Sequence, residues 1–234
     1  MYMSRASLKP EAAANKDFWK LAMDLGDNYR IHRAIWSLFE KDPDKKRDFL
    51  YRQDEKDGFP SFYIVSEHAP ENHSDLWSIE SKKYTPSLFP GQKLVFSLRA
   101  NPIVTRWDED ENGKPHQHRH DVVMDAKTRM EKEGIPENKI PQVPDIVQEE
   151  GVEWLQKKGD LNGFEVSEGQ VIATGYCCNR FYKPKGKHSV TISTIDFSGI
   201  LTVTDPESLT DALYKGIGPA KSFGCGLMLV RSAR

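Results

Sequence analysis

The side chains best suited to chemistry lie on one helical stretch, NYRIHRAIWSLFE, at residues 28–40. At about 100° per residue, its apolar residues gather on one arc and predict the face that packs on the core: Ile31, Ala34, Ile35 and Leu38. The opposite arc carries a phenol, an imidazole, a guanidinium and an indole, from Tyr29, His32, Arg33 and Trp36. Imidazole transfers protons near neutral pH, guanidinium binds phosphate, and aromatic rings stack on bases. This face suits a nucleic-acid substrate, unless Trp36 packs on another domain and His32 is incidental.

A glycine-rich loop, GIGPAKSFGCGL at residues 216–227, resembles a phosphate-binding loop at first sight. The nucleotide-binding P-loop requires two glycines that would fall on Lys215 and Ala220, and it runs from a strand into a helix. This loop instead follows a helical stretch and enters the apolar run GLMLV. ATP binding is therefore not expected, and a helix end followed by a tight turn is the simpler interpretation.

A basic turn stands out from Asn179 to His188, NRFYKPKGKH, which holds four cations and no acid: Arg180, Lys183, Lys185 and Lys187. Such a turn either binds a polyanion or is an ordinary solvated turn. An acidic run at residues 108–111 would repel a polyanion, and we interpret it as solvated.

Two further groups of residues are weaker candidates for chemistry. His116, His118 and His120 alternate, so on a strand all three would face one way, as metal ligands can. They lie in a charged segment without a well-placed fourth ligand, and we predict no metal site. Cys177 and Cys178 would point to opposite faces of a strand, so a core role is expected for them.

The elements that must position these residues follow one pattern twice. Periodicity predicts a strand (YMSRASL), a helix, two strands, a weakly indicated helix and a strand in residues 1–90. A clearer copy of the same order follows in residues 91–234, with strands at KLVFSLRANPIV and HSVTISTIDFSGILTV and a helix that stops at Gly163. The order β-α-β-β-α-β predicts an α+β protein with two tandem ferredoxin-like domains, a fold shared with RNA-recognition domains. A charged segment at about residues 107–144 reads as an insertion or flexible loop in the second domain.

Composition narrows the class of protein. The 234 residues are 38% hydrophobic and 29% charged with a net charge of −2, which is ordinary for a globular protein. No apolar run reaches the roughly 18 residues of a membrane span, the first residues lack the apolar stretch of a signal peptide, and three cysteines do not form a disulfide framework. We expect a cytoplasmic protein without membrane contact.

Four motifs give the chain a resemblance to a known family. The N-terminal MYMSR, the helix pattern Y-x-x-H-R-x-x-W, the segment LRANP and the closing GIGPAKSFGCGLMLV are similar to signatures of the CRISPR-associated endoribonuclease CasE family, also called Cse3. The resemblance runs nearly end to end. It implies two ferredoxin-like domains that bind the repeat hairpin of precursor CRISPR RNA, cut at its 3′ base without a cofactor, and stay on the product beside other subunits of the Cascade complex.

The resemblance also implies roles for single residues. The family's catalytic histidine and tyrosine fall on His32 and Tyr29, and we add Arg33 to offset charge on the phosphorane. Its glycine-rich loop falls on Gly216, Gly218, Gly224 and Gly226, with Lys221 nearby, so the phosphate that it contacts is an RNA backbone. Its basic hairpin falls on Arg180, Lys183, Lys185 and Lys187.

The implied reaction is attack of a ribose 2′-OH on the adjacent phosphorus, which leaves a 2′,3′-cyclic phosphate. Two other functions stay open. The first is a scaffold that holds the RNA hairpin without cutting it, and the second is a ferredoxin-like regulator that binds a metal or a small molecule through the three histidines.

Overall fold

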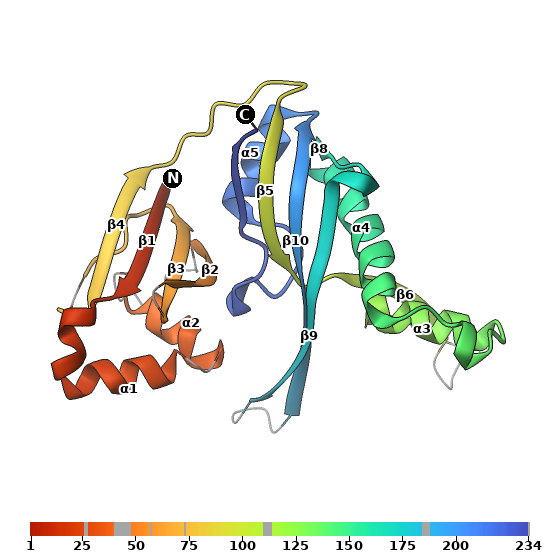
Figure 1. Ribbon diagram of the computed structural model, residues 1–234, viewed down its shortest axis with the longest axis horizontal. Coiled ribbons are helices and arrows are strands. Elements are labelled where there is room, and N and C mark those ends of the chain that lie inside the picture. Colours follow the sequence, from red (N-terminus) through yellow and green to blue (C-terminus); the bar gives the residue numbers. More distant parts are fainter. Residues whose placement is uncertain are drawn as a thin grey trace. The chain divides into compact units, whose positions relative to one another are not determined.

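Antiparallel strands with helices packed on them make up both parts of the chain in the computed structural model (Figure 1). It describes residues 1–25, 28–39, 48–56, 58–72, 74–109, 114–183 and 188–233. Contacts between Cα atoms divide the chain into a first unit, Met1–Leu88 with Thr210–Met228, and a second unit, Phe89–Leu209 with Leu229–Arg234. The division after Leu88 lies close to the predicted boundary at residue 90, and the packing adds Thr210–Met228 to the first unit.

The first unit is built on a four-stranded sheet in the order β2-β3-β1-β4, with every pairing antiparallel. That order is the one expected of a ferredoxin-like unit, in which the first strand lies between the third and the fourth. Its elements are β1 (Tyr2–Leu8), η1 (Pro10–Ala14), α1 (Lys16–Asp24), α2 (Asn28–Trp36), β2 (Phe49–Lys56), β3 (Phe59–Ser66) and β4 (Trp77–Lys83).

One face of this sheet carries the core of the first unit. Along β1, Ser4, Ala6 and Leu8 are buried while the residues between them are more exposed, as the alternation of a strand requires. Helices α1 and α2 supply Phe18 and Ile31, among others, to the same hydrophobic cluster. The helices therefore cover one face of the sheet, and α2 is fixed to it by its apolar stripe.

Two features of the first unit differ from the sequence prediction. Helix α1 was not predicted, because Trp19 and Met23 are exposed and blur the apolar pattern of this nine-residue helix. The helix weakly indicated between β3 and β4 is wrong, since the described residues there form only turns and extended chain.

The second unit repeats the strand order with longer elements. Strands β11, β5 and β10 are neighbours in one sheet and β9 pairs with β10, which gives the order β11-β5-β10-β9. Its elements are β5 (Lys93–Ala100), β6 (Ile103–Glu109), β7 (Pro115–Asp121), α3 (Val122–Lys132), η2 (Glu137–Lys139), α4 (Val143–Asn162), β8 (Phe164–Glu165), η3 (Glu168–Gln170), β9 (Val171–Lys183) and β10 (His188–Val203). The last elements straddle the division between the units: α5 (Pro206–Lys215), η4 (Lys221–Phe223) and β11 (Met228–Ser232). The predicted α+β class with two ferredoxin-like repeats is confirmed.

The longest helix, α4, ends where the sequence predicts. Gly163 follows its last residue with φ of 73°, and a Cβ at this position would lie 2.2 Å from the carbonyl oxygen of Asp205. Only glycine fits such a left-handed helix end at such close approach. No helix in the described ranges is long and apolar enough to cross a membrane.

Strands β9 and β10 continue as a two-stranded ribbon beyond the rest of their sheet (Figure 1). Strand β5 pairs with β10 only from Ile195 to Thr202, whereas β9 pairs with it from His188 to Gly199. Cys177 and Cys178 lie on this ribbon and are exposed, so the prediction of a core role for them is wrong. A two-stranded ribbon has no third layer to bury them.

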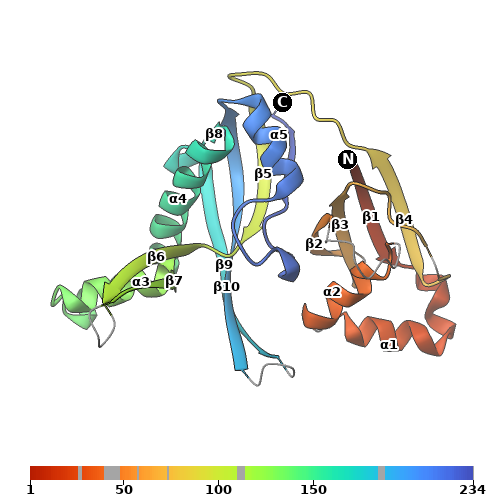
Figure 2. The same ribbon diagram turned by 180° about the vertical axis from the view of Figure 1, so that it is seen from behind.

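The charged segment predicted to be an insertion or a flexible loop is a folded insertion in its described residues. It forms the hairpin β6–β7 and the helix α3, which are inserted between β5 and α4 (Figure 2). Helix α3 buries Val122, Val123 and Ala126. Ion pairs add to this packing, because Arg106 of β6 binds Asp125 of α3 and Arg129 of α3 binds Glu150 of α4. Charged contacts of this kind leave little apolar periodicity in the sequence, which is why the pattern missed them.

Candidate active site and RNA-binding surface

Helix α2 presents two faces, as its sequence predicts. Ile31, Ile35 and the following Leu38 are buried in the core of the first unit. His32 is half-buried and Arg33 is exposed. The helix thus holds an imidazole at the boundary between the core and the solvent, and a guanidinium just outside it. The backbone of Tyr29 lies in the first turn of α2, but its side chain is outside the described residues.

Aromatic rings surround His32. The centroid of its ring lies 6.0 Å from that of Phe49 and 6.4 Å from that of Tyr51, with interplanar angles of 30° in both cases. Trp36 meets it edge-on at 5.7 Å. The Nδ1 atom of His32 is inaccessible to solvent. Packing therefore restricts the orientation of this imidazole. Trp36 packs on Phe49 of its own unit, whereas the alternative left open for it was packing on another domain.

The glycine-rich loop belongs to the same unit as His32. Its short helix η4 lies against α2 and β2, and the Tyr51 hydroxyl donates a hydrogen bond of 2.8 Å to the carbonyl oxygen of Ser222. Tyr51 therefore stacks near His32 with its ring and holds the loop with its hydroxyl. The sequence linked His32 to the loop only through the family resemblance, which implies that both contact the same RNA. The packing places both in one unit.

Glycine is needed in this loop for backbone shape. Gly216, Gly218, Gly224 and Gly226 all have positive φ, and so does Ala220 at 58°. A Cβ on Gly216 would lie 2.9 Å from a methyl carbon of Leu50, and one on Gly224 would lie 3.3 Å from the ring of Tyr51. The loop follows α5 and enters β11, so the expectation of a helix end and a tight turn, as opposed to a P-loop, is confirmed.

Lys221 folds back on the helix that precedes the loop. Its Nζ atom donates a hydrogen bond of 2.7 Å to the carbonyl oxygen of Lys215, the last residue of α5. A cation at this position also interacts favourably with the negative end of the helix dipole. Lys221 therefore stabilises the conformation of the loop, and its predicted contact with RNA stays a prediction.

A second arginine, which the sequence analysis did not single out, lies beside the predicted one. Arg30 and Arg33 line an open pocket of about 380 Å³ together with Leu21 of α1 and Ala34. Two guanidinium groups at one pocket are well suited to bind a phosphate group. The adjacency of Arg30 to Tyr29 in the motif was the signal that could have identified it.

The basic turn is described only in part. Arg180 lies on β9 opposite Thr191 of β10 and is exposed. Lys183 is the last residue of β9, but its side chain is outside the described residues, and Lys185 and Lys187 lie outside them entirely. The β9–β10 ribbon thus positions Arg180 and the backbone of Lys183 well away from the core of their sheet.

The three alternating histidines lie on β7, where every residue from Pro115 to His120 is exposed. The Nδ1 atom of His116 lies 2.9 Å from Nε2 of His118, and the ring centroids of His118 and His120 are 6.1 Å apart. Among the described residues, the trio does not form a cluster of three mutually close ligand atoms.

The segment LRANP is structural, since Arg99 pairs with Asp196 at 2.7 Å and buried Asn101 donates to the Ser193 carbonyl.

Known proteins resemble this chain over almost its whole length. A family profile described as CRISPR associated protein matches residues 1–232. The CRISPR system Cascade subunit CasE of Escherichia coli K12 is 32% identical over 204 residues, which cover 86% of this chain and 90% of that protein. The CRISPR-associated endoribonuclease Cse3 of Thermus thermophilus is 25% identical over 249 residues, which cover 98% of this chain and 99% of that protein.

Solved structures agree with these sequence matches. The crystal structure of the CRISPR-associated protein Cas6e from Escherichia coli K-12 has a TM-score of 0.62 at 26% identity and covers 100% of both chains. The structure of Thermus thermophilus Cse3, bound to an RNA that represents a pre-cleavage complex, has a TM-score of 0.65 at 23% identity and covers 98% of each chain, a likeness in fold. With a profile that spans nearly every residue and a relative more than 30% identical, the chain belongs to the CRISPR-associated protein family that includes CasE and Cse3.

Proposed function

We propose that this chain is the endoribonuclease that processes CRISPR RNA, and that it cuts precursor RNA at the 3′ base of each repeat hairpin. The observation that carries the proposal is the position of Tyr51. Its ring packs beside the His32 ring, and its hydroxyl binds the glycine-rich loop at Ser222. The His32 imidazole and the glycine-rich loop thus belong to one folded unit. The relatives named as a Cascade subunit and as an endoribonuclease support the same activity.

The reaction is a transesterification in which the RNA supplies its own nucleophile. The 2′-OH upstream of the cut gives its proton to solvent water and attacks phosphorus, the bond from phosphorus to the 5′-oxygen breaks, and the products are a 2′,3′-cyclic phosphate and a 5′-OH. His32 donates the proton that the leaving 5′-oxygen takes up. Since its Nδ1 atom is shielded from solvent, Nε2 is the nitrogen that reaches the RNA.

Two neighbours of His32 complete the catalytic set. Arg33 offsets the charge that builds up on the phosphorane oxygens, and the pocket that it shares with Arg30 receives a phosphate of the backbone. Tyr29, one helical turn from His32, orients the 2′-OH or the scissile phosphate. The reaction uses no cofactor and no metal ion.

Binding of the hairpin falls to two surfaces. The RNA backbone approaches the loop at the partly exposed Gly216 and Gly218, with Lys221 nearby, and the buried Gly224 and Gly226 give the loop its shape. The ribbon β9–β10 supplies cations for the phosphates of the stem, from Arg180, Lys183, Lys185 and Lys187. The processed RNA stays bound, and the protein acts as a Cascade subunit together with the other subunits in the cytoplasm.

The test uses the host's repeat hairpin as an RNA of natural ribose and as an RNA with a single 2′-deoxy substitution just upstream of the cut. Both are incubated with the enzyme, with and without EDTA, and product ends are analysed. We expect the ribose RNA to be cut to a cyclic phosphate and the deoxy RNA to stay intact. Its binding should be retained, because one hydroxyl contributes only about 0.5–1.5 kcal/mol.

Two other outcomes would contradict the proposal in different ways. If the deoxy RNA is cut and EDTA stops the reaction, a metal-activated water is the nucleophile. If neither RNA is cut but both bind tightly, the protein is the RNA-holding scaffold that the sequence also allows.

A further inference from the structure

Three metal-ligating side chains meet at the open end of the β2–β3 pair, outside the site described above. Asp48 directly precedes β2, and Glu67 and His68 directly follow β3. Phe49 pairs with Ser66 in the ladder, so these flanking residues are brought together. The backbone N–H of Glu67 donates to the carbonyl oxygen of Asp48 at 3.3 Å. The sheet itself therefore fixes the approach of the three residues.

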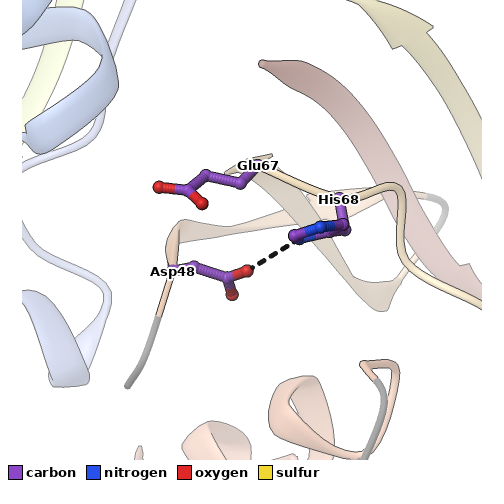
Figure 3. Close-up of side chains that lie close together, drawn as sticks. All are labelled: Asp48, Glu67 and His68. Carbon is purple, nitrogen blue, oxygen red and sulfur yellow. Dashed lines mark hydrogen bonds and ion pairs between the residues drawn. The ribbon is translucent and has the colours of Figure 1, made fainter. Parts of the chain in front are cut away.

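The geometry of the three ligand atoms fits one ion. Figure 3 shows the side chains grouped at the strand ends, with Asp48 joined to His68. The distance from Asp48 Oδ2 to His68 Nδ1 is 3.1 Å, and all three ligand atoms lie within 4.8 Å of one another. An ion with bonds of about 2.1 Å holds two ligands about 3.0 Å apart at a right angle and about 4.2 Å apart when they are opposite. Small rotations of exposed side chains would bring all three onto a single ion.

One ligand is anchored and the others are open to solvent. The Asp48 side chain is 14% exposed, whereas that of His68 is 64% exposed. The hydroxyl of fully buried Ser66 donates to the carbonyl oxygen of His68 at 2.6 Å and fixes the turn that carries the imidazole. An ion can therefore enter from solvent, take three protein ligands and keep water in its remaining positions.

An open pocket borders the cluster within the first unit. Asp48 and Glu67 line a volume of about 420 Å³ together with Asp211, Lys215 and Lys221, among others. The Lys215 ammonium pairs with Asp211 in the same helix, and the Lys221 ammonium donates to the Lys215 carbonyl. Both lysines thus have partners on the α5 side of the pocket, and the carboxylates of Asp48 and Glu67 lie on the other side with His68.

From these observations we propose that Asp48, Glu67 and His68 bind a divalent transition-metal cation. An imidazole beside two carboxylates favours Mn²⁺ or Zn²⁺ over Mg²⁺ and Ca²⁺, which prefer oxygen ligands alone. The ion joins the start of β2 to the end of β3, next to Phe49, whose ring lies near His32. Its role is to hold these two strand ends together. It takes no part in RNA cleavage, so the inference does not rest on the proposed function.

The test measures Mn²⁺ binding to the full chain after it has been stripped with a chelator. Free Mn²⁺ is counted by its electron paramagnetic resonance signal as the protein is titrated. His68→Ala and Glu67→Gln change exposed side chains, so both variants should fold, which circular dichroism without metal verifies. We expect each to bind Mn²⁺ at least about tenfold more weakly than the parent chain, since each loses one of three ligands. His116→Ala is the matched control and should bind as the parent does.

Thermal unfolding gives an independent reading. With Mn²⁺ about a hundredfold above its Kd, the unfolding midpoint of the parent chain should rise by about 5–10 °C, and that of His68→Ala should not move. An unchanged Kd in both His68→Ala and Glu67→Gln would overturn the proposal, as would an absence of binding at about 1 mM Mn²⁺. Loss of binding in His116→Ala alone would place the ion on β7 and would equally refute the assignment.

Discussion

The two ferredoxin-like repeats have the same strand order and different proportions. In the first repeat the sheet strands are seven or eight residues long, and a short helix, α2, carries an imidazole at the edge of an aromatic cluster. In the second repeat β9 and β10 are 13 and 16 residues long and extend past their sheet, and the 20-residue α4 buries its apolar face on it. The first repeat orients the side chain of His32, and the second extends its β9–β10 ribbon beyond its own core.

Under the proposed function, this difference divides two requirements of an RNA-processing enzyme between the repeats. Proton transfer requires a side chain held in a fixed orientation, which a dense aromatic environment such as that of His32 provides. Binding a charged stem requires cations spread over a long surface, which a ribbon provides and a compact sheet does not. Variants in each repeat should therefore change different measured quantities.

The largest effect is expected from His32→Ala. Single-turnover cleavage of the repeat hairpin should fall by about 10²- to 10⁴-fold, because general acid–base groups typically contribute that much. Hairpin affinity should change by less than about twofold, since the imidazole is half-buried among aromatic rings. His116→Ala is the control, as it removes an exposed imidazole from the other repeat. A loss below about fivefold would remove His32 from the chemistry.

The next effect is expected from replacing Lys183, Lys185 and Lys187 together with alanine. Hairpin affinity should fall by about 10- to 100-fold near 0.1 M salt, and the slope of log K against log salt should decrease by about 2–3. Cleavage at saturating RNA should hardly change, because the catalytic helix is in the other repeat. The control replaces three exposed lysines elsewhere in the second repeat: Lys132, Lys139 and Lys157. An unaltered slope would place the RNA on another surface.

A smaller effect concerns the attachment of α5 to the first repeat at high pH. Burial, with a contribution from Tyr214, raises the pKa of Tyr84 to about 12, and the Tyr214 hydroxyl donates to the Tyr84 carbonyl. In the unfolded chain the pKa of Tyr84 is about 10. The contribution of this group to the free energy of unfolding is therefore fully present below pH 10 and is lost as the pH rises towards 12. Between pH 10 and pH 12 the free energy of unfolding should fall by about 1–2 kcal/mol through this group.

Chemical denaturation at a series of alkaline pH values measures this loss. Tyr176 and Tyr214 also have raised pKa values, so the decrease in the parent chain includes their titration. Tyr84→Phe isolates the first group and should give a visibly flatter dependence on pH. If the free energy of unfolding depended on pH equally in the two proteins, the pKa of Tyr84 would not be raised in the folded chain.

The smallest effect is expected from Tyr51→Phe, which keeps the ring and removes the hydrogen bond to Ser222. Stability should decrease by about 1 kcal/mol and cleavage by less than about tenfold, because the loop loses one fixed point but His32 keeps its neighbours. Tyr63→Phe on β3, in the same sheet, is the control. If Tyr51→Phe were as inactive as His32→Ala, the loop itself would have to contribute to the chemistry.

Local patterns predicted much of the fold. The alternation in YMSRASL and HSVTISTIDFSGILTV gave β1 and β10 with the observed bounds, and Gly163 marked the end of α4. KLVFSLRANPIV read as one strand because the alternation continues through Asn101 and Pro102, where β5 ends before β6. Helix α3 escaped prediction since its buried apolar residues, Val122, Val123 and Ala126, lie in its first turns and charged residues dominate the rest.

The site was harder to predict than the fold. Helical spacing was enough to place His32 opposite the buried stripe of α2, but it said nothing of Phe49 and Tyr51, which come from a different element. The contact between Tyr51 and Ser222 joins residues 171 positions apart, and no local pattern encodes such a pair. The pocket beside Arg30 and Arg33 likewise depends on α1, which the sequence analysis did not find.

That same long-range contact has a consequence for the newly made protein. About 120 residues separate Leu88 from Thr210, the point where the chain returns to its first unit. At about 5–20 residues per second, the ribosome takes about 6–24 s to synthesise them. During this time the nascent chain has α2 but lacks the loop that lies against it, so the packing of the first unit is incomplete. The first unit therefore completes its fold only after Thr210–Met228 has been synthesised.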